Sequence, residues 1–252
     1  MAGGTFDEAR RRAHLAQLRT LLPGNASYDL EMLPFHATVE ALGHAGEVDL
    51  GRVDVPLVDV VGSVARARDF DRALRPRNPV LRERWDAVAR IEGDLPPVEL
   101  IRLNDFYFVE DGHHRVSVAR ARGMGTIPAH VRRIMTIACA NRALTVADLP
   151  AKAAERMFLE RVPLGDDARI GFRLDHPDRW RELAEVAEAW GFRQHLAGHA
   201  VRDRCELADR WWAEEIVPLL VGLRARGVHV DDGADTPAFS ARAVDLLAAL
   251  RD

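Results

Sequence analysis

The middle of the chain is compatible with only one order of local structures. Two short runs rich in aromatic and β-branched residues are separated by Asn104-Asp105 alone, which predicts a β-hairpin. The second run ends at Asp111-Gly112, where a helical pattern begins, and that pattern ends at Gly123 before a further strand. The predicted order is strand, turn, strand, tight turn, helix and strand, at residues 98–103, 104–105, 106–110, 111–112, 113–122 and 127–134.

The segments that precede this stretch have simpler patterns. Leucines at helical spacing, Leu15, Leu18 and Leu22, together with a second stretch near 39–42, predict that the first fifty residues are helical. A run rich in valine at 53–61 predicts a buried strand that leads into Gly62-Ser63, and an apolar stripe at 81–88 predicts a short helix.

Beyond residue 140 the pattern is mostly helical. Thr145 and Asp148 form a predicted capping box at the start of a helix. Alternating apolar and polar residues at 168–174 predict one strand among the helices. Later apolar stripes predict further helices, with a break at Pro218, at 180–190, 212–223 and 244–250.

We therefore expect an α+β protein in three parts. Residues 1–50 form an N-terminal helical segment, 51–135 a small mixed β/α domain that contains the tight turn, and 136–252 a mostly helical C-terminal region. Tryptophans in that last region predict either a helical core or a contact between two copies of the chain, as in a homodimer.

Composition excludes several classes of protein. Of 252 residues 48% are hydrophobic and 29% charged, which is typical of globular proteins. The formal net charge of −4 argues against a chain that coats nucleic acid or an anionic membrane. Two cysteines 66 positions apart form neither a disulfide framework nor a paired-thiolate zinc site. Without an apolar leader or an 18-residue apolar run, a cytoplasmic protein with no membrane contact is expected.

The turn at residues 111–115 is the candidate functional site. The exposed amides at a helix start favour anions, Gly112 allows close approach to the backbone, and Arg115 in the first turn would bind a phosphate with paired donors. Five arginines and no acidic residue lie between 112 and 133, and residues 66–90 hold eight arginines against four acidic residues.

The stretch from 53 to 134 resembles the ParB/sulfiredoxin-like superfamily. The resemblance is carried by the strand at 55–61, the strand start at 95–100, the Glu110-Asp111-Gly112-His113-His114-Arg115 turn and the segment from 123 to 128. It implies a ParB-like nucleotide-binding domain in which Gly112 and Arg115 contact nucleotide phosphates together with Mg²⁺. Residues 62–71 resemble the superfamily's first box, which implies that Ser63 and Arg66 or Arg68 lie near the same nucleotide.

The chain also departs from known members of the superfamily. Sulfiredoxins carry a reactive cysteine directly after the turn glycine, whereas His113 stands here, so repair of sulfinic acids is excluded. Chromosome-partitioning ParB proteins continue into a helix-turn-helix, which the predicted strand at 168–174 interrupts, so direct DNA binding is disfavoured. Kinases of free serine in the superfamily have an Asp-Gly-His-x-Arg turn, which 111–115 matches better.

Several residues are open to more than one interpretation. Asp111 either caps the helix or ligates Mg²⁺. His113 and His114 lie about 100° apart on a helix, so one of them would contact phosphate or transfer a proton while the other packs. Asp69 either ion-pairs with a neighbouring arginine, holds Mg²⁺, or takes the proton of Ser63.

The function expected from these residues is Mg²⁺-dependent binding of a nucleoside triphosphate, CTP or ATP, with hydrolysis or phosphoryl transfer. One alternative is a kinase that acts on a small hydroxyl compound such as free serine. A second alternative is a nucleotide-sensing regulator that contacts a partner through its C-terminal helices.

Overall fold

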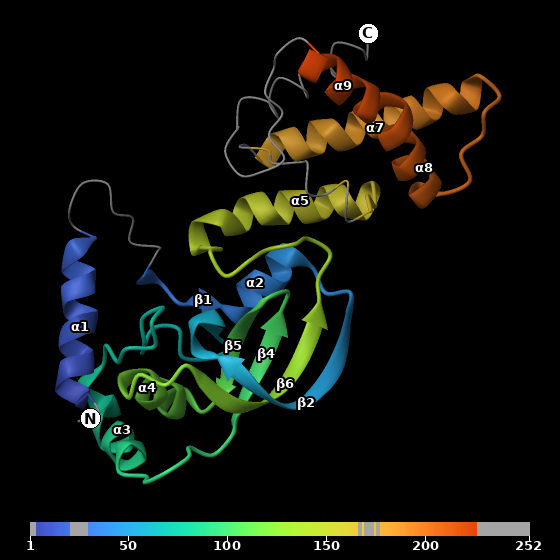
Figure 1. The fold of residues 1–252 in the computed structure, drawn as a ribbon. Helices are drawn as coiled ribbons and strands as arrows, with labels where there is room; N and C mark the ends of the chain where they lie inside the picture. Colours follow the sequence, from blue (N-terminus) through green and yellow to red (C-terminus); the bar gives the residue numbers. More distant parts are fainter. Residues whose placement is uncertain (1–3, 21–29, 166–167, 169–173, 175–176, 226–252) are drawn as a thin grey trace. The chain divides into compact units, whose positions relative to one another are not determined.

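The computed structural model describes residues 4–20, 30–165, 168, 174 and 177–225, and the chain forms two compact units, 1–149 and 150–252. The first unit contains helices α1 (Phe6–Arg19), α2 (Phe35–Leu42), α3 (Arg82–Ala89) and α4 (His113–Ala121), and strands β1 (Leu33–Pro34), β2 (Gly46–Pro56), β3 (Val60–Ser63), β4 (Val98–Leu103), β5 (Phe106–Asp111) and β6 (Thr126–Met135) (Figure 1). Short 3₁₀ turns are η2 (Leu57–Asp59), η3 (Pro79–Leu81) and η4 (Val146–Asp148).

The six strands form one mixed sheet in the order β1-β3-β5-β4-β6-β2. The β4–β5 and β6–β2 pairs are antiparallel, and the others are parallel. The hairpin predicted at 98–110 is confirmed: Leu103 pairs with Phe106, and Asn104 adopts the left-handed conformation that its tight turn requires. The α+β fold class is therefore confirmed.

Helices cover both faces of the sheet. On one face Leu100 and Val109 belong to the main hydrophobic core, to which α3 and α4 contribute Trp85 and Val116. Phe108, the residue before Val109 on β5, points to the other face because side chains alternate along a strand. There it meets Phe35 of α2, with ring centroids 5.5 Å apart.

The sequence predicted that the N-terminal fifty residues are helical, and this prediction is only partly right. They form α1 and α2, but also β1 and the start of β2 at Gly46. The leucine stripe also mispredicts the buried face of α1: Leu15 and Leu18 are 52% and 46% exposed, while Phe6 is buried at the end of the helix next to α3. Leu22 lies outside the described residues.

The single strand predicted at 53–61 is also wrong. β2 ends at Pro56, η2 follows, and β3 begins only at Val60. A contact distant in sequence stabilises this interruption, because the buried guanidinium of Arg120 on α4 donates to the carbonyl oxygens of Leu57 and Val60. A valine-rich pattern alone carries no information about that arginine.

The second unit contains helices α5 (Leu149–Arg161), α7 (Pro177–Leu196), α8 (Arg204–Trp211) and α9 (Val217–Ala225), with a π-helical turn η5 (Trp212–Ile216) between the last two. The predicted capping box of Thr145 and Asp148 is present immediately before α5. Trp180, Trp190 and Trp211 are buried, which confirms the helical core. The predicted strand residues 169–173 and the helix at 244–250 lie outside the described residues.

The predicted helix break at Pro218 is wrong. The chain stays helical from α8 through η5 into α9. In the π-helical turn the Val217 amide bonds to the carbonyl oxygen of Trp212, five residues earlier, and this wider turn accommodates the proline that follows. No helix of the described part of the chain is long and apolar enough for a membrane span.

Candidate functional site

Two neighbouring parallel strands bring the candidate residues together. β3 and β5 pair in parallel with Ser63 opposite Val109, so both strands end at the same edge of the sheet. At that edge β5 passes through Gly112 into α4, and β3 passes into the loop that carries Arg66 and Asp69. The sheet topology thus places the predicted box at 62–71 beside the predicted turn at 111–115.

Glycine is the only residue type that fits position 112 of this turn. Its φ of +94° lies in the left-handed region, which disfavours side chains. A Cβ added there would lie 2.5 Å from Cγ1 of Val98 on β4, closer than packed atoms approach. Gly112 is also the residue that precedes the first helical turn, and no side chain caps that turn. The expectation that Asp111 caps α4 is therefore wrong, because Asp111 still belongs to β5.

Ser63 and His113 form a buried hydrogen-bonded pair. Ser63 Oγ lies 2.7 Å from Nε2 of His113 and also accepts the backbone N–H of Arg66 at 2.9 Å. Neither Ser63 nor His113 is more than 6% exposed. The partner of the Ser63 hydroxyl is therefore a histidine, whereas the sequence had suggested Asp69 as its base.

His114 is equally buried but lacks one partner. Its Nδ1 has no hydrogen bond to any described residue. The ring of Phe70 packs edge-on against His114, with centroids 5.7 Å apart, and is stacked on His113 at 6.0 Å. Phe70 thus fixes both imidazoles, and Nδ1 of His114 stays buried without a hydrogen-bond partner among the described residues.

Both histidines are held neutral near pH 7. Burial lowers the pKa of His113 to about 4, and the charge of Arg66 acts in the same direction. Burial likewise lowers the pKa of His114 to about 4, with Arg84 and then Arg66 as the next causes. Two cations, Arg66 in the β3–α3 loop and Arg84 on α3, therefore act electrostatically on the first turn of α4.

Arg115 is in the predicted turn, but it is engaged within the protein. Its guanidinium donates to Asp111 at 2.6 Å and to the carbonyl oxygen of Pro97, with a longer contact of 3.4 Å to that of Pro96. These contacts link the turn to the start of β4. They hold the turn in shape, while the phosphate-binding role expected from the sequence stays a prediction.

The charged residues of the predicted box separate into two groups. Arg66 forms an ion pair with Asp69 at 3.7 Å, and both charges act on the two histidines. The ion pair agrees with the plainer of the interpretations of Asp69. Arg68 is exposed, and its charge is not among those that shift the pKa of His113 or His114. The structure thus brings Arg66, but not Arg68, to the site.

The carboxylates here do not make a metal site by themselves. Among the described residues no group of three or more His, Cys, Asp or Glu side chains could hold a metal ion. Asp111 is the candidate magnesium ligand from the sequence, but its carboxylate is exposed and already paired with Arg115. Magnesium is usually held by one or two carboxylates together with substrate phosphates. The donor set of the described residues alone does not fit a resident Mg²⁺ ion.

Sequence reasoning missed Arg84 and Phe70. Arg84 reaches the site only because α3 packs on α4, where Trp85 Nε1 donates to the buried hydroxyl of Ser117 at 2.9 Å. Phe70 belongs to the box at 62–71, and its aromatic side chain was the one signal in the sequence that could have drawn attention to it. The structure shows that it is buried. Neither position follows from spacing along the chain, since both depend on the packing of separate elements.

Comparison with known proteins gives one remote structural match. Neither a scan against models of protein families nor a search of curated proteins finds a match. A search of solved structures finds sulfiredoxin from Arabidopsis thaliana, which is 24% identical. The match covers 33% of this chain and 86% of that chain, with a TM-score of 0.24. A similarity this low supports no conclusion about family or activity.

Proposed function

We propose that the first unit binds a nucleoside triphosphate, with the phosphates at the start of α4. The observation that carries this proposal is a helix start that no side chain caps, beside Arg66 and Arg84, whose charges both lower the pKa of His114 in its first turn. The first amides of any helix lack partners within the helix, and the helix dipole favours an anion there. An anion at this point would satisfy both the amides and the two cations.

The proposal gives each residue a distinct role. The amides of the first turn bind phosphate oxygens, Arg66 and Arg84 supply the balancing charge, and Arg115 keeps Gly112 and the turn in place. The resemblance of residues 110–115 to the ParB/sulfiredoxin-like turn supports the same ligand class. Mg²⁺ would arrive with the nucleotide, coordinated mainly by its phosphates.

A matched pair of arginine variants tests this proposal. Arg66→Gln removes a cation that acts on both histidines, whereas Arg68→Gln removes a second exposed cation, two residues away, that is not among the causes of either pKa shift. A charge-assisted bond contributes about 1.5–3 kcal/mol, so Arg66→Gln should weaken binding about 10- to 100-fold. Titration calorimetry with ATP, CTP, GTP and UTP, each with and without Mg²⁺, measures the affinities.

Arg68→Gln should keep its affinity within about twofold of the unmodified protein, because its charge lies outside the site. Arg84→Gln should behave like Arg66→Gln. Equal losses from Arg66→Gln and Arg68→Gln, or no heat with any of the four nucleotides at millimolar concentration, would exclude the site.

His114 favours a second candidate function, phosphoryl transfer to a small hydroxyl compound. Its Nδ1 is buried without a hydrogen-bond partner among the described residues, and its pKa of about 4 keeps the imidazole neutral at pH 7. In such a reaction the substrate oxygen bonds to the γ-phosphorus and the bond to the bridging oxygen breaks. The nucleoside diphosphate then leaves, and the hydroxyl proton passes to Nδ1.

His114→Asn tests this second candidate, because asparagine keeps a polar group near the place of Nδ1 but cannot act as a base. Mass spectrometry of mixtures with ATP, Mg²⁺ and free amino acids should show a phosphorylated product for the unmodified chain. The variant should form it about 100-fold more slowly or worse, while its nucleotide affinity stays within a few-fold. Absence of any phosphorylated amino acid would eliminate the kinase and leave nucleotide binding in place.

A further inference from the structure

A cavity beside α1 is separate from the site at α4, and three of its seven lining residues are arginines. Its volume is about 410 Å³, within the range of small-molecule sites. The lining residues are Asp7, Arg10, Arg11, Ala13, His14, Gln17 and Arg77. We propose that this cavity binds a small phosphorylated molecule, with the phosphate among the guanidinium groups of Arg10, Arg11 and Arg77.

The geometry of α1 explains why these side chains converge. Phe6, Ala9 and Ala13 form the buried face of the helix, and the edge of Phe6 packs against Trp85 of α3 at 5.8 Å. Because this face anchors the helix, the neighbouring stripe that contains Arg10 and His14 must face the cavity. Arg77 enters from the loop that joins β3 to α3, where its guanidinium donates to the carbonyl oxygen of Leu30.

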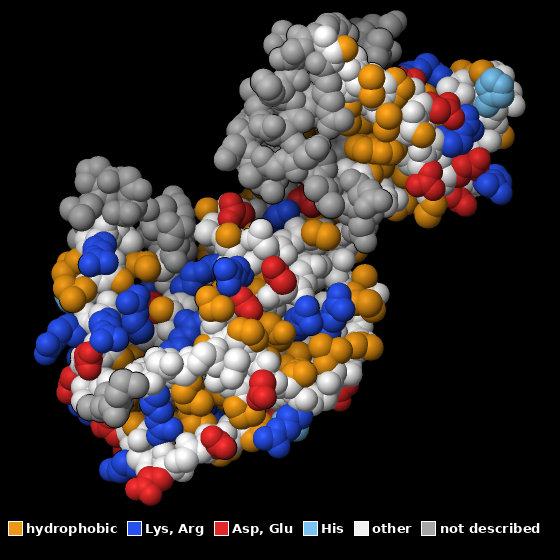
Figure 2. Space-filling model, viewed as in Figure 1, with side chains coloured by type: hydrophobic (Ala, Val, Ile, Leu, Met, Phe, Trp, Pro, Cys, Tyr) orange, Lys and Arg blue, Asp and Glu red, His pale blue; other side chains and the backbone are white. Residues whose placement is uncertain are grey.

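Positive charge exceeds negative charge among the residues that line the cavity. Three guanidinium groups line it against one carboxylate, Asp7. That carboxylate is bound by both terminal nitrogens of Arg82 outside the lining, and this bond lowers the pKa of Asp7. Arg10 and Arg11 form no ion pair with any residue that the structure describes. Figure 2 shows Lys and Arg side chains gathered along α1.

A phosphate monoester is the ligand class that fits best. A dianionic phosphate accepts the paired donors of arginine at several oxygens, which a single carboxylate cannot match. The net charge of −4 makes the positive charge here local, so it would not hold a long nucleic acid. The cavity also has room beyond the phosphate, with the amide of Gln17 available to hydroxyl groups.

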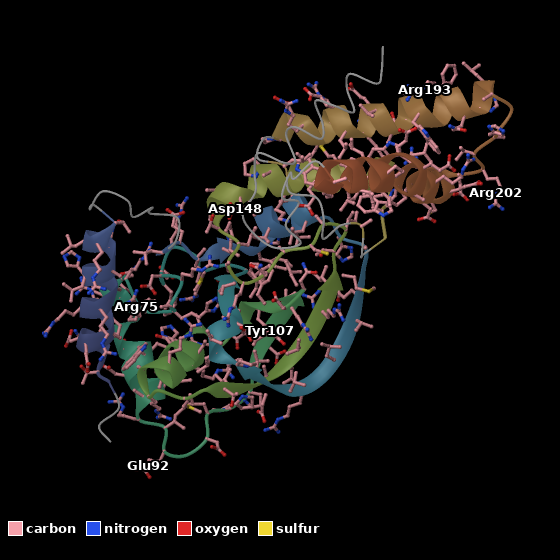
Figure 3. All side chains as sticks on the ribbon, turned by 45° about the horizontal axis from the view of Figure 1, so that its top comes forward. Arg75, Glu92, Tyr107, Asp148, Arg193 and Arg202 are labelled. Atoms are coloured by element: carbon pink, nitrogen blue, oxygen red, sulfur yellow. The ribbon has the colours of Figure 1, made fainter. Side chains whose placement is uncertain are left out.

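The same helix supplies a matched control. Arg12 follows Arg10 and Arg11 in sequence but lies on another side of α1, where it pairs with Glu8. It lines a second cavity of about 240 Å³ together with Arg75 and Arg120. Figure 3 labels Arg75 on the β3–α3 loop beside α1. Arg12→Gln therefore removes the same charge from the same helix without touching the proposed site.

The experiment titrates the full chain with ribose 5-phosphate and with inorganic phosphate by calorimetry. The Arg10→Gln/Arg11→Gln double variant should bind ribose 5-phosphate at least about 10-fold more weakly than the unmodified chain. Arg12→Gln and Arg66→Gln should each stay within about twofold, because their charges lie outside the cavity. Circular dichroism checks that each variant keeps its helical content.

Three outcomes would overturn the proposal. No binding of either probe up to about 10 mM would exclude a specific site. A loss in Arg12→Gln as large as in the double variant would indicate diffuse attraction to the whole helix. A loss confined to Arg66→Gln would place the ligand at α4, so this result also separates the cavity from the proposed nucleotide site.

Discussion

At the residue scale, Ser63 and His113 depend on each other. Both are buried, and the 2.7 Å contact between Ser63 Oγ and His113 Nε2 satisfies polar atoms that water cannot reach. Leaving one such atom without a partner costs about 1–3 kcal/mol. The pair therefore stabilises the end of β3 against the start of α4, independently of any ligand.

We predict that Ser63→Ala lowers the free energy of unfolding by about 1–3 kcal/mol, because it leaves His113 Nε2 and the Arg66 amide without their partner. Urea denaturation measures the change. A double-mutant cycle with His113→Leu should give a coupling energy of at least about 0.5 kcal/mol. Additive effects of the two substitutions would show that the contact contributes nothing to stability.

The two histidines also predict how stability depends on pH. Their folded pKa values of about 4 lie below the ordinary value of 6.5, so the unfolded chain binds more protons in between. Their contribution is fully present above pH 6.5 and is lost as the pH falls through about 4. One pKa unit corresponds to about 1.4 kcal/mol. Protonation of the two histidines should therefore lower the free energy of unfolding by several kcal/mol between pH 6.5 and about pH 4.

Urea midpoints measured between pH 7.5 and pH 4.5 test this dependence. His114→Asn should make the loss of stability smaller, since one of the two titrating groups is gone. A midpoint that stays constant over this range, or the same slope in the variant, would contradict the assignment of these pKa values to buried histidines.

At the element scale, the junction of β5 and α4 requires glycine for two separable reasons. Gly112 has a left-handed backbone, and the space where its Cβ would lie is filled by Val98. Gly123, after the end of the same helix, also has a left-handed backbone, but nothing lies within 4 Å of its Cβ position. The two glycines therefore share the left-handed backbone and differ in the steric contact at the Cβ position.

Gly123→Ala should therefore cost about 1–2 kcal/mol, the penalty of the left-handed conformation alone. Gly112→Ala should cost about 1–3 kcal/mol more, because overpacking against Val98 adds to that penalty. Thermal or urea unfolding of both variants measures the difference. Combining Gly112→Ala with Val98→Ala should relieve part of the clash and restore part of the lost stability. Equal stability of Gly112→Ala and Gly123→Ala would show that the contact with Val98 adds no cost.

At the scale of the whole molecule, the six-stranded sheet lies entirely within the first compact unit. We predict that a fragment of residues 1–149 folds without the rest of the chain. Trp85 is its single tryptophan and is buried between α3 and α4, so it reports on this core. Its fluorescence should be blue-shifted and should move to the red in one cooperative urea transition. Emission typical of a solvated indole in buffer would show that the fragment needs the second unit.

The sequence by itself determined the local features of this protein. The hairpin at Asn104, the helix that starts after Gly112 and the capping box at Thr145 all follow from backbone preferences of neighbouring residues. It also singled out the segments 62–71 and 111–115, which the parallel pairing of β3 with β5 brings to the same edge of the sheet.

Only the tertiary structure decided what those residues do. Arg120 interrupts the valine-rich run, Phe70 and Ser63 enclose the histidines, and Arg84 reaches them through the packing of α3 on α4. Each of these contacts joins residues far apart in the chain, so no local pattern records it. Arg115 shows the same limit: its motif indicated a phosphate ligand, and only the structure shows that Pro96 and Pro97, just before β4, supply carbonyl oxygens to its guanidinium.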